Sequence, residues 1–210
     1  MAAKKKKYHH GDLPRALVAS ALEIVEKEGP EALTVREAVK AVGVTHGAAY
    51  RHFKDKTALL AAIAEEGYRV LKERLRVAPG LPTRGHRARL RSLAAAYVSF
   101  SIERPAFFRV MSGPRLNEDG QFPSLEKEVG ECFGIVLAEI EEGQKEGVFR
   151  PIPVRDLAIT VWTTAHGFVD LVLRRRIKVK STKLAVEYFE KLIEPVLDGL
   201  VTEPRHAKKS

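Results

Sequence analysis

Cysteine is almost absent from this sequence: Cys132 is the single cysteine among 210 residues. One thiol cannot form an intrachain disulfide, which excludes a disulfide-stabilised scaffold and fits a reducing cytoplasm. Long apolar runs are also missing. The most hydrophobic stretch, residues 157–173, is interrupted by three threonines, a histidine and an aspartate, which indicates a buried helix rather than a membrane span. No apolar segment follows the lysines at 4–7, so no secretory signal is predicted.

The sequence has no alternating run of polar and β-branched residues long enough to form a strand. It also lacks a glycine-rich phosphate loop, a nucleophile elbow and a helix with paired histidines. Those motifs are the usual signs of nucleotide, hydrolase and zinc sites. We therefore expect an all-α protein without a catalytic site, a cofactor or a bound metal.

Apolar residues recur with helical spacing along almost the whole chain. A first helix is expected to end at Gly29-Pro30. Thr34, with a glutamate three residues later, forms a capping box for the second helix, and Asp55 is placed to cap a longer one. The best candidate linker is Pro-Gly-Leu-Pro at 79–82. Further helices are predicted to begin near His86, Pro105, Ser124, Pro153 and Ser181, with a loop over residues 117–123.

Charge is net positive but unevenly spread. The chain carries 36 basic and 27 acidic residues, a formal net charge of +9, which suits a polyanionic partner. Residues 69–91 hold eight basic residues and one acidic residue, whereas residues 117–146 hold nine acidic and two basic. The overall charge therefore does not locate a nucleic-acid surface, and individual residues must do so.

The most informative segment is residues 33–53, whose pattern predicts two short helices joined by a tight turn at Gly43-Val44. Thr45 is placed to cap the second helix through its hydroxyl. The small residues at 47–49 let the backbone approach base edges, and an alanine methyl can contact a thymine methyl. The aromatic and basic residues that follow supply phosphate contacts, as suits a helix inserted into the major groove of DNA.

These residues also have a plainer interpretation. Tyr50 and Phe53 are three residues apart, so either can belong to the core, and Phe53 is the stronger core candidate. Arg51 and His52 on an ordinary surface helix would form a solvated face. The combination of a glycine turn with small residues after it favours DNA binding over these alternatives.

Residues 9–64 resemble the DNA-binding domain of TetR/AcrR-type transcriptional regulators. This resemblance implies a three-helix DNA-binding head, joined by a long helix to a larger helical ligand-binding and dimerisation body, and repression relieved by a small molecule. The sequence departs from the family pattern at Pro14, Ala38-Val39 and Val42, which bears on local helix packing. The matching text is His10-Gly-Asp-Leu13, Leu33-Thr-Val-Arg-Glu37, Gly43-Val-Thr-His-Gly-Ala48, Tyr50-Arg-His-Phe53, and Asp55-Lys56 followed by Leu59-Leu60.

The same resemblance implies which residues face DNA. Bases are expected to be read by Arg36, His46 and Ala48. The DNA backbone is expected to be contacted by Tyr50, His52 and Lys56. The full predicted set, with the cap residue of the second helix, is Thr34, Arg36, Thr45, His46, Gly47, Ala48, Tyr50, Arg51, His52 and Lys56.

Further along, Val161-Trp-Thr-Thr-Ala-His-Gly167 is similar to a Trp-x-x-x-His-Gly signature in the C-terminal domain of one branch of these regulators. Trp162 and His166 are one helical turn apart and so share a helix face. The alternative is that the aromatic residues here are plain core and that His166 is a buried histidine bonded to Asp170. The predicted pocket for an apolar or amphipathic effector consists of Phe100, Phe107, Phe108, Met111, Phe133, Trp162 and His166.

The last two helices are expected to form a homodimer. Residues 157–173 are apolar around much of the helix. Two such helices from each subunit make a four-helix interface, whose two-fold symmetry predicts a palindromic operator with half-sites about 34–36 Å apart. The basic residues 174–180 are expected in an exposed loop. A second apolar stripe, on one long final helix, consists of Leu184, Tyr188, Leu192, Val196 and Leu200.

The predicted protein is a cytoplasmic, sequence-specific DNA-binding transcriptional regulator, a homodimeric repressor released from its operator by a small effector. Two alternatives stay open: an effector-independent DNA-binding protein, and an enzyme with an unrecognised helical active site. For the enzyme, Cys132 with a histidine is a candidate nucleophile, although its apolar neighbours indicate a core residue. The expected divisions are a basic disordered arm over 1–10, a helix-turn-helix domain over 11–55, an effector-binding and dimerisation domain over 56–202 and a flexible tail over 203–210.

Overall fold

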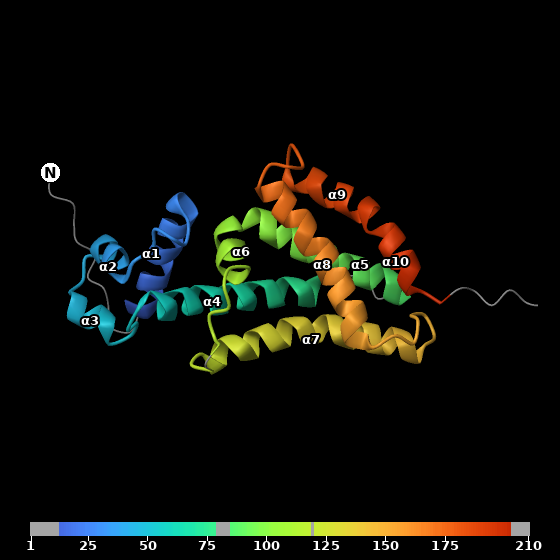
Figure 1. The fold of residues 1–210 in the computed structure, drawn as a ribbon, viewed down its shortest axis with the longest axis horizontal. Helices are drawn as coiled ribbons and strands as arrows, with labels where there is room; N and C mark the ends of the chain where they lie inside the picture. The colour runs from blue at the N-terminus through green and yellow to red at the C-terminus, as the bar shows by residue number, and fades with distance from the viewer. Residues whose placement is uncertain (1–12, 79–84, 119, 203–210) are drawn as a thin grey trace, which may run out of the picture. The chain divides into compact units, whose positions relative to one another are not determined.

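The computed structural model describes residues 13–78, 85–118 and 120–202, and over those residues the chain is helical and has no strand (Figure 1). The predicted all-α class is confirmed. The predicted arm at 1–10, linker at 79–82 and tail at 203–210 lie outside the described residues. The helices are α1 (Leu13–Glu28), α2 (Val35–Val42), α3 (His46–Tyr50), α4 (Lys56–Val77), α5 (Gly85–Glu103), α6 (Pro105–Met111), α7 (Pro123–Lys145), α8 (Val154–Leu173), α9 (Thr182–Leu192) and α10 (Glu194–Leu200).

The helices are grouped into two compact units, and both α4 and α7 contribute residues to each unit. The first unit comprises Met1–Tyr68 and Pro105–Lys127, and the second comprises Arg69–Arg104 and Glu128–Ser210. These units describe which helices pack together, not which residues bind DNA or effector. The functional domains predicted over 11–55 and 56–202 therefore stay predictions.

In the first unit, α1 packs against α2, α3 and α6. α1 buries Leu17, Ala21 and Val25, whose spacing of four residues places them one above another on a single helix face. Ala38 and Val39 of α2 are buried as well, so the departure from the family pattern at these positions is accommodated in the core. Phe53 is only 8% exposed and belongs to this core, as predicted.

In the second unit, α5 packs against α8 and α9. Glu194 of α10 accepts hydrogen bonds from Arg87 and Arg91 of α5, and these bonds lower the pKa of Glu194 against the opposing effect of its partial burial. The stretch at 157–173 is a buried helix, as predicted. The side of α8 that faces the core carries Leu157, Ala158, Val161, Ala165, Phe168, Val169 and Val172.

A buried ion cluster also lies within this unit. Lys72 of α4 is 6% exposed, and its ammonium donates to Glu128 at 2.5 Å and to Glu131 at 2.7 Å on α7. These hydrogen bonds raise the pKa of Lys72 against the effect of desolvation. A buried ammonium without such partners would be costly, so the cluster fixes how this part of α4 packs on α7.

The predicted helix starts agree with the structure, but the predicted long final helix is wrong. Helices α5 to α9 each begin within one residue of the expected position. The predicted helix is interrupted at Ile193, which separates α9 from α10. Pro195 lies in the first turn of α10, where its missing N–H is tolerated. The predicted stripe is therefore not continuous. Leu184, Tyr188 and Leu192 on α9 are 46%, 50% and 38% exposed, whereas Leu200 is buried.

We expect Gly143→Ala to destabilise the fold. A Cβ at this position of α7 would lie 2.4 Å from the Phe149 ring and 3.1 Å from the Cβ of His86, and overpacking of this kind costs about 1–3 kcal/mol. The control is Gly130→Ala on the same helix, where an added Cβ meets nothing within 4 Å. It should stabilise α7 by up to about 1 kcal/mol through helix propensity. Urea unfolding of both variants measures the difference, and equal midpoints would contradict this packing.

Candidate nucleic-acid interface and effector site

Caps at both ends shape the short helices of the first unit. Thr34 and Thr45 each accept, through Oγ1, a hydrogen bond from the backbone N–H three residues later, at 3.1 and 3.4 Å. Asp55 accepts in the same way through Oδ1 at 2.7 Å, at the start of α4. Gly43 ends α2 in the left-handed region with φ of 76°, a conformation that glycine adopts without strain. The three predicted caps and the glycine turn are confirmed.

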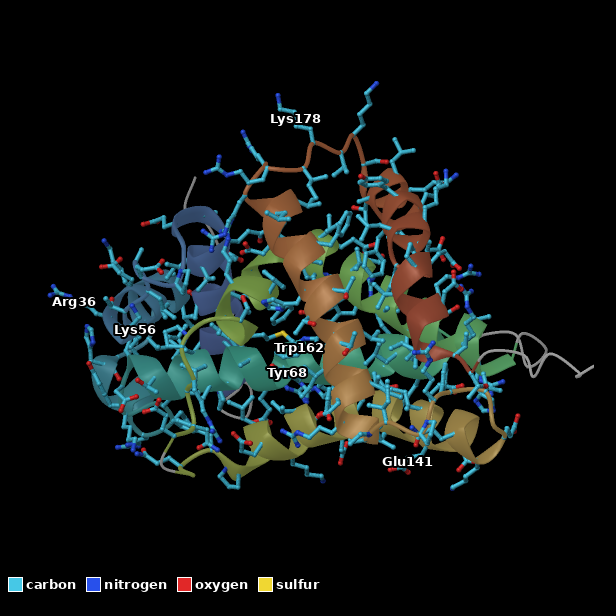
Figure 2. All side chains as sticks on the ribbon, turned by 45° about the vertical axis from the view of Figure 1, so that its right-hand side comes forward. Arg36, Lys56, Tyr68, Glu141, Trp162 and Lys178 are labelled. Atoms are coloured by element: carbon cyan, nitrogen blue, oxygen red, sulfur yellow. The ribbon has the colours of Figure 1, made fainter. Side chains whose placement is uncertain are left out.

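The turn presents most of the predicted DNA-facing residues to solvent. Tyr50 is 50% exposed, whereas the neighbouring Ala49 is fully buried. Arg36 of α2 extends away from the ribbon in Figure 2. Of the predicted set, Ala48 and Lys56 are half-buried. The exposed members are Thr34, Arg36, Thr45, His46, Gly47, Tyr50, Arg51 and His52.

Two lysines beside the start of α4 have partners that the sequence did not predict. The ammonium of Lys56 donates to the backbone carbonyl oxygen of Glu31 at 2.8 Å. The ammonium of Lys54 donates to Oε1 of Gln121, also at 2.8 Å. Gln121 is 67 residues further along the chain, and no local pattern signals such a pairing. The structure thus connects Lys54, which follows the predicted recognition helix, to a residue just before α7.

The residues predicted to line an effector pocket fall into both compact units. Phe107, Phe108 and Met111 belong to the first unit, where Phe107 and Phe108 are buried. Here α6 approaches α4 closely: a Cβ added at Gly67 would lie 2.6 Å from Sδ of Met111 and 2.9 Å from the Phe107 ring. Phe100, Phe133, Trp162 and His166 belong to the second unit.

In the second unit, His166 lies between Tyr97 of α5 and Trp162 of α8. Its Nδ1 is 2.9 Å from the Tyr97 hydroxyl, and its ring centroid is 5.4 Å from that of Trp162. Burial lowers the pKa of His166, against a smaller opposing effect of the Asp170 carboxylate, which itself accepts from Nε of Arg174. Tyr97 was missed by the sequence analysis, although it lies three residues before Phe100 and so one turn from a predicted pocket residue.

Cys132 is buried, as its neighbours predicted. Burial raises the pKa of its thiol to about 12, chiefly because a thiolate would be desolvated there. A thiol of this pKa carries almost no thiolate at neutral pH, and the thiolate is the nucleophilic form. The structure therefore gives no support to a cysteine nucleophile.

Among the described residues, no helix is long and apolar enough to cross a membrane.

One side of α8 carries threonines whose hydroxyls are bonded to the backbone of the same helix. Thr160, Thr163 and Thr164 each donate their hydroxyl to a backbone carbonyl one turn earlier, at 2.8–2.9 Å. Their hydrogen-bonding capacity is therefore largely used within the helix. The side also carries Gly167 and the exposed Leu171. In the loop that follows α8, all the basic residues between 174 and 180 are exposed, as predicted.

Comparison with known protein families accounts for both parts of the chain. A model of bacterial regulatory proteins of the tetR family matches residues 17–63, which contain α2, α3 and the capped turn. A model of the tetracyclin repressor-like C-terminal domain matches residues 90–196, which is half of the chain.

Individual relatives are similar to this chain over nearly its full length. The nucleoid occlusion factor SlmA of Vibrio campbellii is 26% identical over 195 residues, covering 90% of this chain and 96% of SlmA. A Rhodococcus sp. RHA1 protein of unknown function is 28% identical, with a TM-score of 0.77 over 94% of this chain and all of that one. The ketosteroid transcriptional regulator KstR2 of Mycobacterium tuberculosis has the same fold, with a TM-score of 0.66, 21% identity, and coverage of 97% of this chain and 100% of KstR2.

The family models and the exposed, capped helix pair lead to one conclusion. A short helix cannot present donors to a DNA groove unless its turn is fixed and its supporting face is buried, and both conditions hold in the first unit. The chain belongs to the TetR family of DNA-binding transcriptional regulators.

Proposed function

We propose that the protein is a sequence-specific repressor that binds a palindromic operator through α2 and α3 and is released by a small apolar or amphipathic effector. The observation that carries the DNA-binding part is the capped turn at Gly43, which leaves Arg36, His46 and Tyr50 exposed around a buried core. Arg36 and His46 are proposed to read base edges, while Tyr50, His52 and Lys56 contact phosphates. A cytoplasmic location follows from this role.

The proposed homodimer forms through α8 and α9. The threonine methyls, Gly167 and Leu171 give α8 a surface of small apolar groups, and α9 adds Leu184, Tyr188 and Leu192. A second copy of the chain is the proposed occupant, because small side chains allow close helix approach and a two-fold axis makes the same surface complementary to itself. Two heads in one dimer account for a palindromic operator.

The proposed effector site lies in the second unit and includes Trp162, His166 and Tyr97, with the predicted aromatic residues Phe100 and Phe133 of the same unit. Because burial lowers the pKa of His166, this site favours a neutral polar group on the effector over an anion. An effector can release the operator only if it binds the two conformations with different affinities.

A second candidate is an effector-independent DNA-binding protein. The SlmA relative, which matches nearly the whole chain, is a nucleoid occlusion factor, and that likeness supports this alternative. The two candidates share the DNA-binding surface and differ in whether a ligand of the second unit changes DNA affinity.

Selection of duplexes from a random DNA pool tests the operator. We expect a recovered near-palindrome. On it, Arg36→Ala or His46→Ala should relax base preference by roughly 1–3 kcal/mol at one position of each half-site, because a base-edge contact is lost. Lys56→Ala should weaken binding evenly across sequences and reduce the salt dependence. Lys27→Ala, an exposed lysine of α1 outside the predicted set, is the control. If all three variants lost affinity equally for every DNA sequence, the assignment of Arg36 and His46 to bases and of Lys56 to the backbone would be wrong.

Leu184→Arg should break the dimer. The substitution places a charge from each subunit in the proposed interface, which we expect to cost about 3 kcal/mol and so raise the dimer dissociation constant about a hundredfold. Val77→Arg is the matched control, since Val77 is 73% exposed on α4 and outside the proposed interface. Sedimentation velocity measures both. Dimers of equal stability in the two variants would place the interface elsewhere.

Trp162 provides a direct report on effector binding because it is the single tryptophan of the chain. We choose steroids as the first probes because a ketosteroid regulator shares the fold, and long-chain alcohols as a second, uncharged amphipathic class. A binding probe should change Trp162 emission and weaken operator binding. Tyr97→Phe should weaken probe binding about fivefold, as expected for one lost hydrogen bond. In the absence of the probe, this substitution should not change operator affinity. Probe binding that leaves operator affinity unchanged would favour the effector-independent alternative.

A further inference from the structure

Lys54 and Lys56 flank the start of α4, and each is held by an uncharged oxygen. Lys54 donates to the amide oxygen of Gln121 and Lys56 to the carbonyl of Glu31, both at 2.8 Å within the first unit. An uncharged acceptor orients an ammonium without cancelling its charge. Because a lysine ammonium has three N–H donors, donors also remain for a phosphate.

This arrangement differs from that of many other basic side chains among the described residues. A basic group paired with a carboxylate must give up that partner before it can neutralise a phosphate. The Asp55 carboxylate, between the two lysines in sequence, accepts from the backbone N–H of Ala58 and caps α4. Basic groups bound by carboxylates include Lys72, Arg74, Arg76, Arg87, Arg89, Arg91, Lys145 and Arg174.

Gln121 lies just before α7, and the residue that follows it is held by a buried side chain. Asn117 is 4% exposed, and its Oδ1 accepts a hydrogen bond from the backbone N–H of Phe122 at 2.6 Å. The backbone N–H of Gly120 points to the carbonyl of Asn117 at 3.5 Å. A buried side chain that bonds the residue directly after Gln121 limits where that glutamine can lie. Oε1 of Gln121 therefore meets the Lys54 ammonium from a constrained backbone position.

We propose that Gln121 is a positioning residue for DNA binding: it holds the Lys54 ammonium, still fully charged, for a backbone phosphate beside the recognition helix. Lys54 lies in the short link between α3 and α4, close to the start of α4, whose first-turn N–H groups and dipole also favour an anion. The inference rests on the proposed DNA-facing surface of α2 and α3. It extends that surface to a residue just before α7.

The choice of amide over carboxylate at position 121 is central to this role. Glutamate has nearly the same shape as glutamine, so Gln121→Glu keeps the contact but converts it into an ion pair. The paired charge would then be unavailable to the phosphate. Alanine at the same position removes the contact and leaves Lys54 charged but less well oriented.

The test measures binding of the full chain to a synthetic duplex of mixed sequence as a function of salt, so it does not require the operator to be known. Each phosphate contact contributes about 0.9 to the slope of log affinity against log salt. Gln121→Glu should therefore lower the slope by about 0.9 for each bound head and weaken low-salt binding about tenfold. Gln121→Ala should keep the slope and weaken binding about twofold, the effect expected of lost orientation alone. Lys54→Met should lower the slope and the low-salt affinity by as much as Gln121→Glu does. The double variant should show no further loss of either.

Ser124→Glu is the matched control, because it adds the same charge at an exposed position of the adjoining turn of α7. It should leave the slope within error of the wild type. An equal loss of salt slope and affinity for Ser124→Glu and Gln121→Glu would overturn the proposal. The loss would then come from added negative charge anywhere near the surface, not from the contact with Lys54. A wild-type slope for Gln121→Glu would overturn it as well. If Arg36→Ala and Lys56→Ala also bind normally, the whole DNA-facing surface is wrong; if they weaken binding while Gln121→Glu does not, only this inference fails. Thermal unfolding of each variant identifies any loss that comes from misfolding.

Discussion

The DNA-binding unit depends on the fixing of helices that are too short to persist alone. α2 has eight residues and α3 has five, and isolated helices of fewer than about 12 residues are marginal in water. Their stability comes from the hydroxyl caps at Thr34 and Thr45, the left-handed turn at Gly43 and a buried face against α1. Because these constraints act on both ends of α2 and on the start of α3, the turn between the two helices and the side chains beside it are held in one arrangement.

The polar contacts that join helices in the second unit differ from those around the start of α4 in the first. In the second unit, ion pairs tie helices together: Lys72 joins α4 to α7, and Glu194 joins α10 to α5. In the first unit, the lysines around the start of α4 are bound by neutral oxygens instead. Ion pairs suit a scaffold, since they satisfy charge internally. Neutral acceptors suit a surface that meets a polyanion, since the positive charge is preserved for the partner.

The sequence predicted the elements whose causes are local. Each cap depends on a side chain and a backbone N–H three residues away, so Thr34, Thr45 and Asp55 were recognisable from their positions alone. Phe53 was recognisable as a core residue from its spacing to Tyr50, and Cys132 from its apolar neighbours. The break at Ile193 was missed, because the apolar spacing continues across it and the proline beyond it is compatible with a new first turn. The exposed residues around the capped turn were predicted, but the contacts made by Tyr97, Gln121 and the Glu31 carbonyl were not.

The sequence by itself determined the helical class, the capped turn and the residues that a DNA-binding helix would expose. It did so because helix periodicity and capping are properties of residues within a few positions of one another. Only the tertiary structure decided which polar groups meet across long separations: Lys54 with Gln121, His166 with Tyr97 and Lys72 with its two glutamates. These pairings follow from how the helices pack. Helix packing is set by the fit of whole buried faces, so no local pattern specifies it.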